Sequence, residues 1–236
     1  VLELPISLEG FRDWQELPTF ALVGLCTGIV CLLFQTFLLF IAKRFQKFHH
    51  HPNKLIFITG LWGCLLGVIL LVKPEVLGIG HTIFEDAIQN SLPFIPAILI
   101  LATRIPLSAI SYATGAPGGL IVPALLFGVL SGQAFSTSYA FIVGGVDADF
   151  HSVCLVAGMA ASIGALFRTP LTATIMAVEI TGAYDCVLEI SIAYLAAHSL
   201  LGLARQPDLY TALGRIHESH TGKQAARIDA ARSSIH

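Results

Sequence analysis

The sequence predicts an all-α, polytopic membrane protein whose helices are unequal in length and in part tilted, broken or re-entrant. Hydrophobic residues make up 55% of the 236 positions, charged residues only 12%, and the mean hydropathy is +0.78. A soluble domain carries about 25% charged residues, roughly twice this share. Glycine and proline interrupt a run at 105–146 that contains no Asp, Glu, Lys or Arg. Irregular backbone at membrane depth is tolerated where it is buried in protein or lines a cavity, so these breaks indicate a transport protein.

Charges, prolines and glycines give the boundaries of the predicted helices, because segments buried on all sides show little periodicity. The first helix is expected at 19–42, which has no charged residue and exceeds the length of about 20 residues that a span needs. A second uncharged run predicts a helix at 55–72. A short helix at 81–90 and a longer one at 93–112 follow, and the shorter one cannot cross a bilayer.

The next three helices are separated by turns. A helix at 120–137 is expected to follow a glycine-rich turn. The helices expected at 151–167 and 170–182 are separated by Arg168-Thr169-Pro170, and proline in a first helical turn restarts a helix after a break. This pair is expected to form re-entrant or half-spanning helices that meet near the middle of the membrane.

Three regions result from this pattern: a polar lead-in at 1–18, a membrane domain at 19–216 and a short polar tail at 217–236. The last full helix, at 187–204, ends before Gln206-Pro207, which breaks it. The tail is expected in the cytoplasm, although the positive-inside rule leaves orientation open. The reason is that the loop before the second helix has a nearly equal share of basic residues, namely Lys43, Arg44, Lys47 and Lys54. The chain opens at Val1 with no secretory signal peptide, and it is expected to be part of a longer protein.

Several classes of protein are excluded by composition and motifs. A net charge of −2 and a pI near 6.5 provide no basic footprint for nucleic acid. No protease, esterase or phosphate-loop motif occurs, so the protein is not expected to be an enzyme or to need a cofactor. The three histidines at 49–51 are expected to be a solvated loop, not a metal site. The five cysteines have no metal-ligand spacing and are expected to be buried thiols.

The stretch Gly-Ala-Pro-Gly-Gly-Leu-Ile-Val-Pro at 115–123 is the strongest candidate for a binding site. It places a turn inside an uncharged segment and presents the N-terminus of the next helix to whatever fills the cavity there. Helix N-termini attract anions. Taken alone, this stretch also fits a simple break between packed helices, since Gly and Pro are common in membrane helices.

In four stretches taken in order, the sequence resembles the CLC family of chloride channels and chloride/proton antiporters. They are the loop at 115–123, the pair Ala-Gly-Met-Ala-Ala and Phe-Arg-Thr-Pro-Leu-Thr at 157–161 and 167–172, Ala-Val-Glu-Ile-Thr-Gly at 177–182, and Pro-Asp-Leu-Tyr at 207–210. The resemblance runs from about residue 19 to residue 216 but covers only the second half of a family subunit. It implies half of an inverted-repeat membrane fold.

The resemblance also implies the residues of a chloride site. The backbone N–H groups of Leu120 and Ile121 would bind the ion, and Tyr210 would add its hydroxyl. The loop backbone that permits the approach comprises Gly115, Gly118, Gly119 and Pro123. Weak, shared coordination of this kind lets an ion leave again. On its own, Tyr210 equally fits an interfacial anchor, as tyrosines gather at membrane boundaries.

Two departures from the family pattern matter. The motif Gly-x-Phe-x-Pro has Ile121 in place of its Phe, which affects rate and selectivity more than the amide contact. The first-half motifs Gly-Ser-Gly-Ile-Pro and Gly-Lys/Arg-Glu-Gly-Pro do not occur in the sequence. These supply the serine ligand and the gating glutamate, and the proton-accepting glutamate belongs to the same half. The sequence therefore leaves open whether the parent protein is a channel or an antiporter. It also leaves open whether the protein is gated by voltage.

The ionisable residues Arg104, Arg168 and Glu179 lie in or beside apolar segments, where such groups often have a function. A structural or vestibule role is expected for Arg168, and the resemblance assigns no proton transfer to Glu179.

The resemblance further implies partners: chloride as the transported ion, protons where exchange is coupled, the lipid of a plasma or inner membrane, and a second subunit in a homodimer. Residues around 19–42 and 170–204 are expected at the dimer contact. Small residues would allow close packing there, namely Gly24, Gly28, Ala173, Ala177, Ala196 and Ala197.

Two alternatives remain at this point. A fluoride-selective relative would keep the fold, and comparing chloride flux with fluoride flux would separate it. The second alternative is a non-transporting half-subunit that acts in membrane protein assembly. In that case, substitution of Tyr210 or Gly118 would not change anion flux.

Overall fold

The computed structural model describes residues 16–45, 52–72, 87, 93–114 and 119–216, and every element in this part is helical. The elements are α1 (Leu17–Phe45), α2 (Pro52–Val72), α5 (Phe94–Ala113), α6 (Ile121–Val143), α7 (Ala148–Phe167), α8 (Pro170–Thr181), the short 3₁₀ turn η1 (Tyr184–Cys186) and α9 (Val187–Leu203). A further helical segment occupies 209–216. The prediction of an all-α membrane protein is confirmed, since five of the described helices are long and apolar enough to cross a membrane.

Most predicted helices agree with the structure, and the differences have local causes. α1, α2, α5, α8 and α9 end within three residues of their predicted bounds. α6 runs six residues beyond the predicted end at 137 and stops only at Gly144, whose φ of 88° closes the helix in the left-handed conformation. The helix expected at 81–90 lies outside the described residues, apart from Ala87.

α7 starts three residues before its predicted bound at 151. It begins at Ala148, after Asp147 in the N-cap position, and its 20 residues give a length of about 30 Å, enough for a full span. α8 has only 12 residues and starts at Pro170, so it is short as expected. The break between them is at Arg168, which has a φ of 55°.

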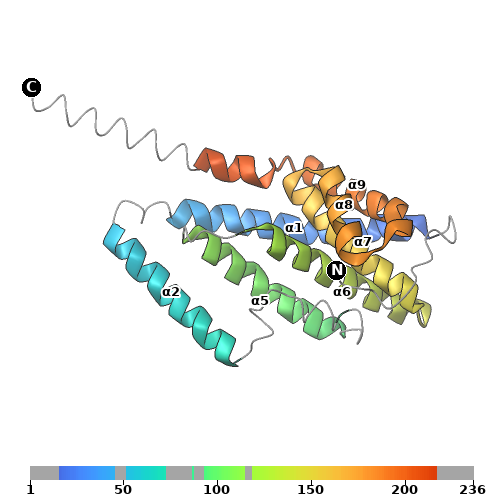
Figure 1. The fold of residues 1–236 in the computed structure, drawn as a ribbon, viewed down its shortest axis with the longest axis horizontal. Helices are drawn as coiled ribbons and strands as arrows, with labels where there is room; N and C mark the ends of the chain where they lie inside the picture. Colours follow the sequence, from blue (N-terminus) through green and yellow to red (C-terminus); the bar gives the residue numbers. More distant parts are fainter. Residues whose placement is uncertain (1–15, 46–51, 73–86, 88–92, 115–118, 217–236) are drawn as a thin grey trace, which may run out of the picture.

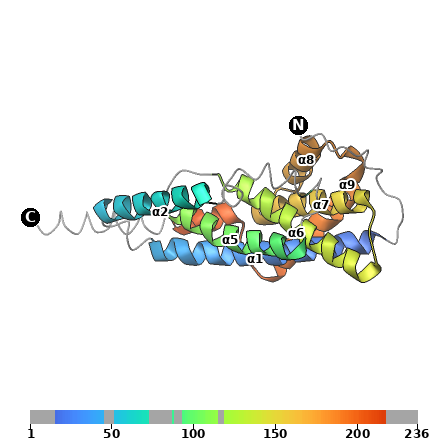
Figure 2. The ribbon, with the colours of Figure 1, turned by 90° about the horizontal axis from the view of Figure 1, so that it is seen from below.

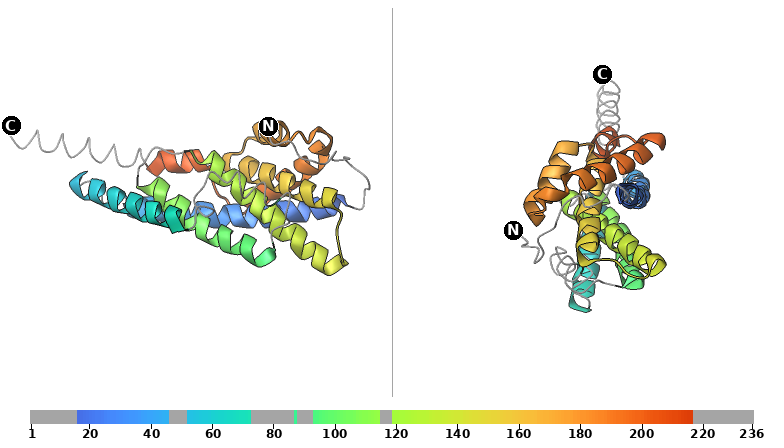
Figure 3. Two further views of the ribbon diagram at one scale, coloured as in Figure 1. Left: turned by 60° about the horizontal axis from the view of Figure 1, so that its bottom comes forward. Right: turned by 90° about the vertical axis from the view of Figure 1, so that its right-hand side faces the viewer.

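The helices form an elongated bundle along the direction of α1 (Figure 1). Seen from below, α2 lies toward one end, and α8 lies toward the other with α7 and α9 (Figure 2). A view along the long axis shows α1 nearly end-on, beside the other helices (right panel of Figure 3). α2 is held to α5 by a hydrogen bond of 3.0 Å from Trp62 Nε1 to Ser111 Oγ.

α7 is the centre of the bundle and packs against α1, α6, α8 and α9. Within its apolar stretch 94% of residues are buried. Its closest neighbour is α6, and the two backbones meet at glycines: a Cβ on Gly128 would collide with Gly158 O, and a Cβ on Gly132 with Cys154 O. Small residues at these crossings allow the close approach, as is usual between membrane helices.

The small residues expected at a dimer contact pack inside the chain instead. A Cβ on Gly24 would collide with the carbonyl of Ala193, and one on Gly28 would lie 3.2 Å from Cα of Ala197. Ala173, Ala177 and Ala197 are fully buried within the chain, and Ala196 is half-buried. The small face of α1 therefore serves the α1–α9 packing of one chain.

The cysteines are free, but only three of them are buried. Cys31, Cys154 and Cys186 are buried, whereas Cys26 and Cys64 are exposed. The expectation of five buried thiols is wrong at these two positions, because the outer face of α1 and most of α2 have no neighbour among the described residues.

Candidate functional site

The N-terminus of α6 presents a row of backbone donors. The helix's own ladder begins with Ala124 N–H, which donates to Leu120 O at 3.1 Å. The N–H groups of Leu120, Ile121 and Val122 precede that ladder, as at any helix start, and Pro123 has none. Leu120 is buried at 2% exposure, and Ile121 is 38% exposed. Of the predicted loop residues, Gly119 is described and has open space where a side chain would be.

Gly115 and Gly118 lie outside the described residues, so their expected role in the loop backbone stays a prediction. Thr114 and Gly119 flank the intervening stretch, and five residues of chain reach at most about 18 Å. The start of α6 therefore lies near the end of α5.

α6 packs antiparallel to α7, and this packing determines where the N-terminus of α6 lies along α7. Ser162 Oγ donates to Ala124 O at 2.7 Å, and one turn further along α6 Gly128 meets Gly158. Moving four residues toward the C-terminus of α6 thus corresponds to moving four residues toward the N-terminus of α7. Continued by four residues, the same register predicts Leu120 opposite Leu166, next to Phe167 at the end of α7.

Tyr210 stacks on that same end of α7. The rings of Phe167 and Tyr210 have centroids 5.0 Å apart and an interplanar angle of 25°, a geometry that stabilises aromatic pairs. Tyr210 is 51% exposed. Tyr112, near the end of α5, lies close enough to Tyr210 for an electrostatic interaction. No hydrogen bond joins Tyr210 to Leu120 or Ile121 in the described part of the chain.

The backbone just before Tyr210 is tied down from two sides. Arg168, at the turn between α7 and α8, donates from Nη2 to Gln206 O at 2.6 Å. Gln35 of α1, which is fully buried, donates from Nε2 to Pro207 O at 2.6 Å. Both acceptors lie in the break that follows α9. These two bonds fix the entry of the helix that carries Tyr210, and they give Arg168 the structural role expected of it.

Asp208 caps the helical segment at 209–216. Its Oδ2 accepts a hydrogen bond from Thr211 N–H at 2.9 Å, the contact of an N-cap residue with the third helical residue. This backbone hydrogen bond lowers the pKa of the Asp208 carboxyl below its usual value, and the nearby Arg168 guanidinium adds to the effect. The ionised carboxylate therefore stabilises the folded helix start.

Replacing Asp208 with alanine is expected to lower the free energy of unfolding by about 1 kcal/mol at neutral pH, the usual effect of losing a cap. Because the folded pKa lies below the unfolded value of about 3.9, the cap contributes fully above that value. Its contribution is lost as pH falls through the folded pKa. Thermal melting of both proteins across acidic pH measures this, and Asp208→Asn is the control, since asparagine also caps. An equal deficit at every pH would contradict the role of the ionised carboxylate.

Sequence reasoning missed Phe167, Tyr112 and Gln35 as neighbours of the candidate site. Phe167 and Tyr112 are aromatic residues directly before the two helix breaks, a position that could have drawn attention to them. Gln35 gave a usable signal as well, because a glutamine in a long uncharged helix needs a partner.

The other ionisable candidates, Glu179 and Arg104, lie on α8 and α5. Glu179 is exposed and accepts a hydrogen bond from Tyr184 Oη at 3.3 Å. Arg104 is buried at 9% exposure within α5. Among the described residues no group of three or more His, Cys, Asp or Glu could hold a metal ion, and the three histidines at 49–51 lie outside that part of the chain.

Comparison with known proteins agrees with this architecture. The H(+)/Cl(-) exchange transporter ClcA of Salmonella arizonae is 30% identical over 210 residues, which cover 88% of this chain and 44% of that protein. ClcA of Vibrio parahaemolyticus is 28% identical over 84% of this chain and 43% of its own length. The crystal structure of a slow cyanobacterial Cl-/H+ antiporter superposes with a TM-score of 0.80 at 22% identity, covering 93% of this chain and 50% of the antiporter. The chain thus spans about half the length of the relatives it matches.

The family comparison settles the membership that the motifs suggested. The sequence profile described as "Voltage gated chloride channel" matches residues 5–202, well over half of the chain. The match includes α1 to α8 and nearly all of α9, and it ends eight residues before Tyr210. The chain is part of a multi-pass membrane protein, and it belongs to the voltage-gated chloride channel family.

Proposed function

We propose that this chain supplies one half of a chloride-transporting membrane protein and binds the ion with the N–H groups of Leu120 and Ile121 and the hydroxyl of Tyr210. One observation carries the proposal. Tyr210, which is half exposed, stacks on Phe167 at the end of α7, and the α6–α7 register, continued toward the start of α6, supports a position of Leu120 near that end. This arrangement supports a site formed by donors from two distant parts of the sequence.

The chemistry of these donors suits chloride. Chloride is large and weakly hydrated, so backbone amides, the positive end of a helix dipole and one phenol can replace its water. No lysine or arginine lies among the three proposed ligands, so the ion would not be trapped. Ile121 stands where the family motif has phenylalanine, and its 38% exposed side chain narrows the site less than an aromatic ring would.

The names of the curated relatives, which are exchange transporters for H(+) and Cl(-), favour coupling to protons over a passive channel. This coupling is part of the proposal, as are the transport of chloride without a cofactor and residence in a plasma or inner membrane. The gating and proton-accepting glutamates of the family pattern do not occur in this chain. The proposal therefore needs these groups to come from outside residues 1–236.

A homodimer is proposed on the outer faces of α8 and α9. These faces expose large apolar side chains, with Leu171 at 77%, Ile175 at 59% and Leu195 at 57% exposure. α1 is a weaker candidate than expected, because its glycine face is already packed on α9.

The test is chloride binding and flux by the protein that carries this chain, reconstituted in liposomes. Tyr210→Phe keeps the stacking on Phe167 and removes only the hydroxyl. A hydrogen bond to a charged group contributes about 1.5 kcal/mol or more, so chloride affinity is expected to fall about tenfold. Tyr184→Phe is the matched control, since Tyr184 is an exposed tyrosine outside the proposed site.

The outcomes separate the alternatives. Flux that passes fluoride and excludes chloride would identify the fluoride-selective relative. Absence of flux from a folded protein, with binding unaltered in the Tyr210→Phe variant, would favour the assembly protein. Equal chloride affinity in wild type and Tyr210→Phe would remove Tyr210 from the site.

A further inference from the structure

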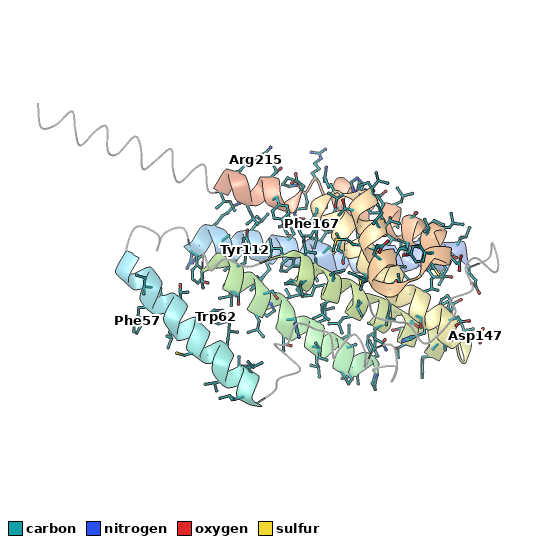
Figure 4. The ribbon with its side chains drawn as sticks, in the orientation of Figure 1. Phe57, Trp62, Tyr112, Asp147, Phe167 and Arg215 are labelled. Atoms are coloured by element: carbon teal, nitrogen blue, oxygen red, sulfur yellow. The ribbon has the colours of Figure 1, made fainter. Side chains whose placement is uncertain are left out.

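A cavity of about 520 Å³ lies between the end of α1 and the helical segment that carries Tyr210. Lys43 and Arg215 line it together with the polar Gln206. The rest of the lining is apolar, namely Leu39, Pro207, Ala212 and Ile216. The α1 end and segment 209–216 lie at the same end of the bundle in Figure 1, and Arg215 stands on the outer edge in Figure 4.

Among the described residues, the charge that lines this cavity is positive. Two of the lining side chains are cations and none is a carboxylate. Within the described part of the chain, neither Lys43 nor Arg215 forms an ion pair. Asp208, the acid that the structure describes in these two segments, accepts a hydrogen bond from Thr211 N–H and lies near Arg168. Two cations facing one hollow repel each other, so an anion between them is favoured.

The surroundings of the cavity indicate where that anion comes from. α1 has 29 residues and is about 43 Å long, so it extends beyond a hydrocarbon core of about 30 Å. Lys43 and Arg44 in its last turn mark the end that reaches the headgroup region. Phe40, one turn before Lys43, is 62% exposed and continues the apolar outer face of α1.

We propose that this cavity binds the phosphate headgroup of an anionic membrane lipid, with Lys43 and Arg215 holding the phosphate. The apolar wall from Leu39 to Ile216 contacts the glycerol and the first acyl carbons. A soluble anion would use the two cations but not that wall. Since Gln206 and Pro207 line the cavity and also anchor the segment leading to Tyr210, the bound lipid stabilises the same segment. The proposal is independent of which ion the protein transports.

The test is lipid binding by the purified protein that carries this chain, measured by native mass spectrometry during titration with phosphatidylglycerol and, separately, with zwitterionic phosphatidylcholine. The wild type is expected to prefer phosphatidylglycerol. Lys43→Gln combined with Arg215→Gln is expected to weaken phosphatidylglycerol binding about 25-fold, because the loss of each direct ion pair between a cation and the phosphate lowers the affinity about fivefold.

The control is Arg44→Gln combined with Arg205→Gln. It removes the same charge from exposed residues next to the same two segments, but neither residue lines the cavity. This control should leave the affinity unchanged. An equal loss in both double variants, or no loss in either, would overturn the proposal. Displacement of the lipid by inorganic phosphate at equal concentration would also overturn it, in favour of a soluble anion. Size-exclusion profiles confirm that each variant is folded.

Discussion

Replacing Gly158 with valine is expected to prevent the central helices from packing and to lower the free energy of unfolding by about 3 kcal/mol or more. The reason lies in the crossing of α7 and α6. A Cβ at Gly158 would collide with Gly128 O and would lie 3.2 Å from both Gly128 C and Gly132 N. All three are backbone atoms of α6, so no side chain can rotate away, and the two helices must separate. Thermal melting and size-exclusion of the purified variant measure the loss.

The matched control is Gly202→Val. Gly202 lies in the last turn of α9, and a Cβ there meets no atom within 4 Å. Its substitution adds the same side chain to a helix without a packing conflict, so the melting temperature should stay close to that of the wild type. If Gly158→Val and Gly202→Val had the same melting temperature, this would contradict the close approach of α6 and α7.

The sequence was sufficient for the fold class because composition and breakers act locally. The predicted bounds of α1, α2, α5, α8 and α9 lie close to the observed ones. They came from uncharged runs of span length and from the prolines and glycines between these runs. The end of α6 was set too early, since residues 138–143 contain no breaker and the helix continues to the glycine pair at 144–145. The missed length of α7 has a similar origin: Asp147 starts the helix earlier than its apolar stretch suggests.

The candidate site was less predictable, because it depends on contacts between distant residues. Tyr210 could be named from a motif, but its stacking on Phe167 joins positions 43 residues apart in the sequence, and no local pattern encodes that contact. The anchoring of Pro207 by Gln35 joins residues 172 positions apart. The use of Gly24 and Gly28 against α9, not against a second subunit, is a further example. A helix face of small residues indicates that another helix packs closely on it. It does not tell whether that helix belongs to the same chain or to a second subunit.

Replacing Arg168 with alanine is expected to lower the free energy of unfolding by about 2 kcal/mol, the range for a hydrogen bond from a charged donor. The guanidinium bond to Gln206 O is lost, and the left-handed backbone at φ 55° remains. The segment at 206–216 should then exchange its amide hydrogens faster. Hydrogen exchange with mass spectrometry measures that change peptide by peptide, together with melting.

Arg168→Gly and Arg205→Gly separate the two roles of Arg168. Arg205 has a similar φ of 51°, but its guanidinium group forms no hydrogen bond within the part of the chain that the structure describes. Glycine adopts this conformation without the cost of about 1 kcal/mol that a side chain incurs. Arg205→Gly should therefore raise stability by about 1 kcal/mol, and Arg168→Gly should recover about the same amount relative to Arg168→Ala. Only the Arg168 variants should speed exchange at 206–216. Faster exchange in Arg205→Gly as well would mean that backbone conformation, not the bond to Gln206, holds the segment that positions Tyr210.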